Sequence, residues 1–256
     1  MDLFLFKLII TPFLLVAATL TTRRWGQTIG GLLVGLPLTS GPVSVFLALE
    51  QGPEFTAAAA HGTINGLIAV IFFCMAYARF AVGCKWPLAS LLAFGVYFVG
   101  VLLFSSPFLP FFCSVFLGIL LLILGAWYIK PATAAIKTLS PPWWDLPFRI
   151  IAATSIVLSI TSASSRLGPE LSGLLSGFPV FVSVMAAFSH GLYGADAAKN
   201  FVRGVLVGSY SFIAYFTFVF LTVQTWNFLW VYVLALAGAL AANGMVFAFL
   251  ARAQKR

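Results

Sequence analysis

Residues 26–66, GQTIGGLLVGLPLTSGPVSVFLALEQGPEFTAAAAHGTING, decide the fold, because the same pattern returns at residues 168–208 as GPELSGLLSGFPVFVSVMAAFSHGLYGADAAKNFVRGVLVG. The two stretches align without a gap at a constant offset of 142. Most matched positions carry Gly or Pro, residues suited to special backbone conformations and close packing, so the chain repeats a backbone design. The matched residues are Gly26, Gly31-Leu32-Leu33, Gly35, Pro37, Phe46, Gly52, Gly62 and Gly66, paired with Gly168, Gly173-Leu174-Leu175, Gly177, Pro179, Phe188, Gly194, Gly204 and Gly208.

The composition is that of a membrane protein. Of 256 residues, 62% are hydrophobic and 8% are charged, and the mean hydropathy is +1.08. This leaves too little polar surface to coat a soluble globule of this length. A helix needs about 20 apolar residues to cross ~30 Å of hydrocarbon. The sequence therefore predicts nine transmembrane helices, at 3–21, 28–49, 56–81, 87–105, 107–129, 147–164, 170–190, 197–222 and 227–250.

The basic residues predict the orientation, because Lys and Arg concentrate in cytoplasmic loops. Nine spans leave only Lys7 and Arg166 of the 14 basic residues on one side, whereas fusing the fourth and fifth spans would favour neither orientation. We therefore expect the N-terminus outside and the C-terminus inside. The net charge of +8 then reflects topology and contact with anionic lipid headgroups, not nucleic-acid binding.

The predicted fold is an all-α polytopic bundle of two inverted four-helix repeats, about 3–105 and 147–250, joined by a linker helix. The odd number of spans inverts the second copy, as in inverted-repeat transporters. We expect a single membrane domain, 1–256, made of repeat one (1–105), the linker helix with a cytoplasmic segment (106–146) and repeat two (147–256). The alternative is that the duplication only enlarges a helix bundle, and that the protein transports nothing.

The candidate substrate path lies where the second predicted span is interrupted. Two prolines remove backbone donors there, and a break in hydrocarbon needs protein partners or a wet cavity. A helix that restarts after Ser40 would point free N–H groups toward the membrane centre, where they suit a carboxylate or phosphate. Paired interruptions in two halves indicate a midplane site; the alternative is a kink that only shapes packing, which we favour for Pro179 alone. The path candidates are Pro37, Thr39, Ser40, Pro42, Ser44, Pro179 and Ser183.

His61 and Arg203 occupy equivalent positions, each about one and a half turns into a predicted span. Ionisable residues at that depth indicate function by default. Inversion places His61 near the outer side and Arg203 near the inner side. The other interpretation is that the basic side chains snorkel, the acids are ordinary loop residues and Asn65 bonds a neighbouring helix. The gating or coupling candidates are Glu50, Glu54, His61, Asn65, His190, Asp196, Lys199 and Arg203.

Glycines spaced by four recur in both repeats and match the small-xxx-small pattern of close helix packing. They predict that the second, third, seventh and eighth spans form the tight centre of the bundle. The pairs are Gly31 with Gly35, Gly62 with Gly66, Gly173 with Gly177 and Gly204 with Gly208.

The sequence does not favour an enzyme. It has no H-E-x-x-H, G-x-S-x-G or phosphate-cradling motif, and its two histidines are predicted on opposite membrane faces. Cys74, Cys84 and Cys113 lack metal-ligand spacing. We expect no cofactor, no metal and no disulfide.

The segments LSGLLSGFPVFVSVMAA (171–187) and GVLVGSYSFIAYF (204–216) resemble the core of GlpM-type bacterial inner-membrane proteins, which are much shorter than this chain. The resemblance covers about half of each repeat. It implies a four-helix unit in a bacterial inner membrane, and it names no substrate because the family has no settled molecular activity.

These observations predict a secondary transporter or exporter of a small anionic or lipid-linked solute that works by alternating access. Its expected partners are the bilayer and a small-molecule substrate. The alternative is a membrane scaffold or accessory subunit of envelope biosynthesis that transports nothing. A continuous polar cavity that reaches the midplane would favour transport, and a dry bundle with internally satisfied prolines would favour the scaffold.

Overall fold

The computed structural model describes residues 3–104, 109–132, 141–159 and 178–253, and this part of the chain is helical with no strand. Five of its helices, α4, α5, α6, α9 and α10, are long and apolar enough to cross a membrane. The all-helical prediction is therefore confirmed, whereas nine spans and their inverted topology stay predictions. The helices are α1 (Leu3–Trp25), α2 (Gln27–Val34), α3 (Ser40–Glu50), α4 (Pro53–Phe80), α5 (Trp86–Phe104), α6 (Phe111–Tyr128), α8 (Val180–Tyr193), α9 (Ala195–Thr222) and α10 (Phe228–Ala253), with a further helical stretch at 145–159.

Prolines and glycines set several of the helix starts. Pro53 opens α4 after Gly52, because proline suits the first turn, where its missing N–H costs nothing. Pro110 and Pro179 precede α6 and α8 as their N-cap residues. These starts differ by a few residues from the predicted spans, since hydropathy does not mark a cap.

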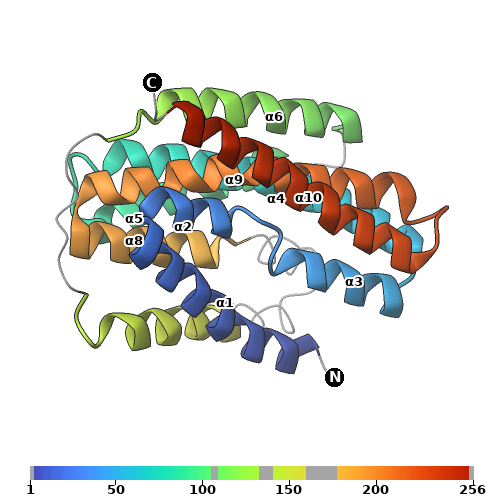
Figure 1. Ribbon diagram of the computed structural model, residues 1–256, viewed down its shortest axis with the longest axis horizontal. Coiled ribbons are helices and arrows are strands. Elements are labelled where there is room, and N and C mark those ends of the chain that lie inside the picture. The colour runs from blue at the N-terminus through green and yellow to red at the C-terminus, as the bar shows by residue number, and fades with distance from the viewer. Residues whose placement is uncertain (1–2, 105–108, 133–140, 160–177, 254–256) are drawn as a thin grey trace.

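Four long helices, α4, α5, α6 and α9, lie along roughly one direction (Figure 1). α4 and α9 pack against each other at the centre, and α6 lies along the top of the view. α10 runs obliquely from the right to the top left, and α1 runs obliquely down to the bottom, where the yellow-green helix 145–159 lies. α6 touches both central helices, because a Cβ on Gly125 would meet Leu206 at 2.8 Å and Met75 at 3.6 Å. The middle of the bundle is thus shared by α4, α6 and α9.

Basic residues gather at one end of this bundle. The end of α1, the α4–α5 turn and the α8–α9 turn all lie at the left of Figure 1. Glu50 and Glu54 flank the α3–α4 turn at the opposite end. The two ends of the bundle therefore differ in charge, and the orientation in a membrane stays a prediction. The basic residues at that end include Arg23, Arg24, Arg79, Lys85, Lys199 and Arg203.

The helix bounds follow the sequence duplication. α4 and α9 have 28 residues each, and their bounds differ by the same 142 positions that align the sequences. α5 and α10 begin at Trp86 and Phe228, which show the same offset. Gly52 and Gly194 precede α4 and α9 with φ of 85° and 91°. The two copies therefore share a backbone plan over these elements.

Apolar side chains are exposed on the outer helices. Leu102 of α5 is 74% exposed, Trp127 of α6 is 78% exposed and Met245 of α10 is 69% exposed. Soluble proteins rarely expose apolar surface on this scale. The outer faces of these helices are thus suited to lipid.

Candidate functional site

The predicted interruption of the second span is confirmed: α2 ends at Val34 and α3 begins at Ser40. Part of the backbone between them is satisfied locally, because the Gly41 N–H donates to Pro37 O at 2.9 Å and the Leu38 N–H donates to Leu36 O at 2.8 Å. Thr39 caps α3 without a side-chain hydrogen bond to the helix. The Thr39 hydroxyl is therefore not used as a cap.

Glycines hold α2 against α9 just before this break. A Cβ on Gly31 would overlap the carbonyl oxygen of Phe201, and one on Gly35 would lie 2.6 Å from Val205 O. On the facing helix, a Cβ on Gly204 or Gly208 would overlap backbone oxygens of α2. The close packing predicted from the glycine spacing is confirmed for these four positions. On α4, a Cβ on Gly62 would have no described atom within 4 Å, and Gly173 and Gly177 lie outside the described residues.

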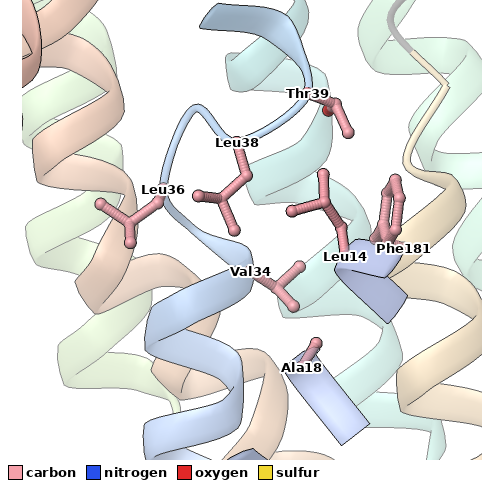
Figure 2. A pocket seen from close by; sticks show the side chains of 7 residues that line it. All are labelled: Leu14, Ala18, Val34, Leu36, Leu38, Thr39 and Phe181. Atoms are coloured by element: carbon pink, nitrogen blue, oxygen red, sulfur yellow. The ribbon is translucent and has the colours of Figure 1, made fainter. Parts of the chain in front are cut away.

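A small cavity lies beside the break (Figure 2). Its volume is about 30 Å³, enough for one or two water molecules, since about 10–15 Å³ holds one. Thr39 is the one path candidate among the lining residues, and the other six lining side chains are apolar. The lining comes from α1, the end of α2, the break itself and α8: Leu14, Ala18, Val34, Leu36, Leu38, Thr39 and Phe181.

Two of the path serines, Ser44 and Ser183, have hydrogen-bond partners away from the cavity. The Tyr232 hydroxyl of α10 donates to Ser44 O at 2.8 Å and lies 3.2 Å from Ser44 Oγ. The Tyr215 hydroxyl of α9 donates to Gly41 O at 3.4 Å. Ser183 Oγ donates to Val180 O at 3.0 Å within α8. The two tyrosine bonds fix α3 to α9 and α10.

The second interruption is described only in part. Pro179 is buried and α8 begins directly after it, whereas residues 160–177 lie outside the described part of the chain. The Phe178 ring stacks on Phe94 of α5 with centroids 4.9 Å apart. The predicted span 170–190 is therefore seen only as its second half.

At the acidic end of the bundle, His61 packs into α6 and α9. His61 Nε2 lies 3.1 Å from Ser114 Oγ, and its ring meets Phe111 and Phe220 edge to face. Glu50 and Glu54 are exposed, and no hydrogen bond or ion pair of the described residues joins them to His61. Nearby on α4, Asn65 Oδ1 is buried with no hydrogen-bond partner among the described residues.

At the basic end, the predicted candidates form separate pairs. Lys199 Nζ lies 3.5 Å from Asp196 Oδ1, and His190 Nδ1 lies 3.4 Å from the Tyr77 hydroxyl. Arg203 Nε is buried with no hydrogen-bond partner in the described part of the chain. Tyr77 follows His61 by sixteen residues on α4, about 24 Å along the helix axis, so the two histidines do not share a site.

Sequence reasoning missed a buried ion cluster at the basic end. Asp145 is fully buried and accepts from Arg149 Nε at 2.7 Å and from Arg23 Nη2 at 2.8 Å. The Arg149 side chain is 2% exposed and the Arg23 side chain is 28% exposed. The cluster joins α1 to the helix at 145–159. One signal was available, because Arg149 falls inside the predicted span 147–164 and four residues after an acid.

Arg149 also contacts α8. Its Nη1 donates to Met185 Sδ at 3.1 Å, and its guanidinium carbon lies 5.0 Å from the centroid of the Phe188 ring. The Thr19 hydroxyl of α1 donates to the same sulfur at 3.5 Å. Thr19 follows the cavity residue Ala18 on α1, so the cluster lies next to the cavity.

The described residues contain no group of three His, Cys, Asp or Glu side chains that would hold a metal ion. No protein-family model matches the chain, and no curated protein or solved structure is significantly similar to it. The likeness to GlpM-type proteins thus rests on the two quoted segments alone, and function must be inferred from the geometry.

Proposed function

We propose that this protein is a secondary transporter or exporter of a small anionic or lipid-linked solute that works by alternating access. The observation that carries the proposal is the break between α2 and α3, which lies inside the bundle beside a cavity. Irregular backbone at membrane depth is tolerated where it lines a cavity or is buried in protein, and broken helices form the midplane sites of many transporters.

The two sides of the break differ in how firmly they are held. α2 is fixed to α9 by backbone contact through the four glycines, and α3 is tied to α9 and α10 by Tyr215 and Tyr232. The opposite wall of the cavity comes from α1 and α8. Because about 30 Å³ admits water and no solute, transport requires α1 or α8 to move away from the break.

An anionic substrate fits the charges near this path. The N-terminus of α3 carries the partial positive charge of a helix start, and basic residues crowd the end of the bundle toward which α8 runs. A phosphate or carboxylate would be attracted to both places. The inner membrane of a bacterium, with the C-terminus inside, is the location that we infer from the charge distribution and the GlpM-like segments.

A membrane scaffold is the second candidate, and one observation favours it. The side chains that line the cavity are apolar except for Thr39, and hydrogen bonds from the Leu38 and Gly41 N–H groups satisfy part of the break internally. A bundle of this kind would use its prolines only to shape the packing of α2 and α3. The two functions differ in whether water reaches Thr39 during activity.

Cysteine accessibility tests the proposal. Thr39→Cys and Ser40→Cys would be made after replacing Cys74, Cys84 and Cys113, and treated with a membrane-impermeant thiol reagent from each side. We expect labelling of Thr39→Cys from at least one side. Ser209→Cys is the matched control, because Ser209 is buried, bonded within α9 and absent from the cavity wall, and it should stay unlabelled.

Protection of both break positions from both sides, in a protein that folds, would contradict the transporter and favour the scaffold. Labelling would justify a screen of anionic solutes in proteoliposomes. In that screen Ser40→Leu should abolish uptake or export, because the larger apolar side chain would occupy the break.

A further inference from the structure

Arg149 is held by acceptors of unequal quality. Its Nε donates to the Asp145 carboxylate at 2.7 Å, whereas its Nη1 donates to the Met185 thioether at 3.1 Å. A thioether sulfur is a weak acceptor, and a buried guanidinium gains much more from an anionic oxygen, which allows charge-assisted and bidentate hydrogen bonds. The Nη1 group would therefore form a stronger hydrogen bond if an anionic oxygen replaced the sulfur.

A second donor converges on the same sulfur. The Thr19 hydroxyl lies 3.5 Å from Met185 Sδ, so an oxygen in the place of the sulfur would receive hydrogen bonds from both Thr19 and Arg149. Met185 is fully buried. A methionine side chain has three rotatable bonds and repacks readily, so it can leave this position without a change in the α8 backbone.

The charge of the cluster favours an anion. Asp145 is shared between Arg149 and Arg23, which leaves a net charge of +1 among these three described side chains. Asp145 and Arg149 are almost fully buried, and an uncompensated buried charge is costly. An added monoanionic group would neutralise the cluster.

The position of the cluster connects it to the break. Ala18 and Phe181 line the cavity, Thr19 is the next residue on α1, and Met185 lies one turn after Phe181 on α8. From the break toward the basic end, the cavity comes first. The contact of Thr19 and Arg149 with Met185 follows, and the pair of Arg23 with Asp145 lies last. A group that entered the cavity between α1 and α8 from that end would come close to Arg149, which contacts Met185 on α8.

We propose that Arg149 and Thr19 form an anion-binding subsite in which an oxygen of a phosphate or carboxylate group displaces Met185 Sδ. This inference rests on the proposed function, because it assigns the anionic group of the transported solute to these side chains. Arg23 assists by holding one oxygen of Asp145, which weakens the competition of that carboxylate for Arg149.

The test is anion binding by the full chain, purified in a neutral detergent. One arm titrates inorganic phosphate, a second adds phosphatidylglycerol to the micelles, and a third adds phosphatidylcholine; the readouts are the thermal unfolding midpoint and a dissociation constant. Binding in the first arm identifies a soluble anion, and binding only in the second identifies a lipid headgroup. Either result supports the subsite if Arg149→Met weakens it by about tenfold or more, as expected for the loss of a charge-assisted hydrogen bond.

Further variants keep the test valid if Arg149→Met fails to fold. Arg23→Gln should weaken anion binding several-fold, because Asp145 then pairs with Arg149 alone; Arg24→Gln, the same change one residue on, should leave binding unchanged because Arg24 stacks on Trp25 outside the cluster. Thr19→Val should weaken binding with no change of charge. Met185→Leu, which removes the sulfur at similar volume, should strengthen it.

Anion binding that is absent in all arms, or equal in the wild type and in folded Arg23→Gln, Thr19→Val and Arg149→Met variants, would overturn the subsite. The outcome is separate from that of the cysteine test. If anion binding depends on Arg149 but the break positions are protected from the thiol reagent, the protein is an anion-binding scaffold. If the break positions are labelled but anion binding does not depend on Arg149, the protein is a transporter whose substrate binds elsewhere.

Discussion

α4 and α9 occupy corresponding places in the two repeats, and their surroundings differ. They share length, offset and a preceding glycine with positive φ. The glycine face of α9 is covered by the backbone of α2, whereas Gly62 of α4 is exposed with open space beside it among the described residues. The duplicated sequence thus sets where helices begin and end, and it does not make equivalent positions equally buried.

The polar side chains of the two helices differ in the same way. His61 of α4 is bonded to Ser114 and packed between two phenylalanine rings, whereas the Nε group of its counterpart Arg203 has no partner among the described residues. One repeat therefore carries its ionisable group in a fixed position and the other carries it with unused hydrogen-bonding capacity.

The strongest test of this comparison replaces a glycine in each helix. Gly204→Val should destabilise the protein by about 3 kcal/mol or more, because its Cβ would overlap Thr28 O and the backbones of α2 and α9 must separate. Gly62→Val should cost much less, since no described atom lies near. The measurement is the unfolding midpoint and folded yield in detergent. Equal losses would show that both glycine faces are packed.

The two turns before α4 and α9 offer a test with a smaller expected effect. Gly52→Ala and Gly194→Ala should each destabilise the protein by about 1–2 kcal/mol, because an L side chain is strained at these φ values. No described atom lies within 4 Å of either new Cβ, so the loss comes from backbone strain alone. Chemical unfolding of both variants should give the same loss, and a clear inequality would refute a shared backbone plan.

The His61 contact predicts a coupling that its counterpart lacks. A double-mutant cycle of His61→Phe and Ser114→Ala should give a coupling energy of about 1 kcal/mol, the usual contribution of one hydrogen bond. His61→Phe keeps the aromatic packing. The control is Arg203→Met combined with Ser114→Ala, which should be additive. A coupling near zero in the first cycle would mean that the His61–Ser114 bond contributes nothing.

The smallest expected changes in stability come from removing a tyrosine hydroxyl on α10 or on α5. Tyr232→Phe should cost about 1 kcal/mol, because the hydroxyl donates to Ser44 O. Tyr97→Phe should be neutral or slightly stabilising, since the buried Tyr97 hydroxyl has no hydrogen-bond partner within the described ranges. Thermal midpoints of the two single variants test this order. A larger loss from Tyr97→Phe would reveal a partner for that hydroxyl.

The features that sequence predicted well are local. Pro37 restricts the backbone locally, and the glycines of α2 and α9 lack the Cβ atoms that would keep the two helices apart, so the break and the close helix contact follow from composition and spacing. The bounds of the long helices were close to the predicted spans, because a run of apolar residues is also a local property of the sequence.

The features that sequence missed depend on which elements meet. Arg149 was placed among the basic residues of the inner side, and its burial becomes evident only when α1 supplies Arg23 and α8 supplies Met185. Ser44 was predicted on the substrate path because its hydroxyl lies near the break. In the structure this hydroxyl is within hydrogen-bond distance of the hydroxyl of Tyr232, 188 residues later. No pattern within one helix indicates such partners.

The contact between α2 and α9 also affects how the chain is made. α2 has eight residues and rises only about 12 Å, too short to cross a bilayer by itself. Its close partner Phe201 follows Gly31 by 170 residues. During synthesis the first repeat must therefore wait in the membrane with its glycine face uncovered until α9 has been translated and inserted. A chain that ended before α9 would leave the glycine face of α2 without its partner backbone, and incompletely packed helices of this kind are prone to misassembly.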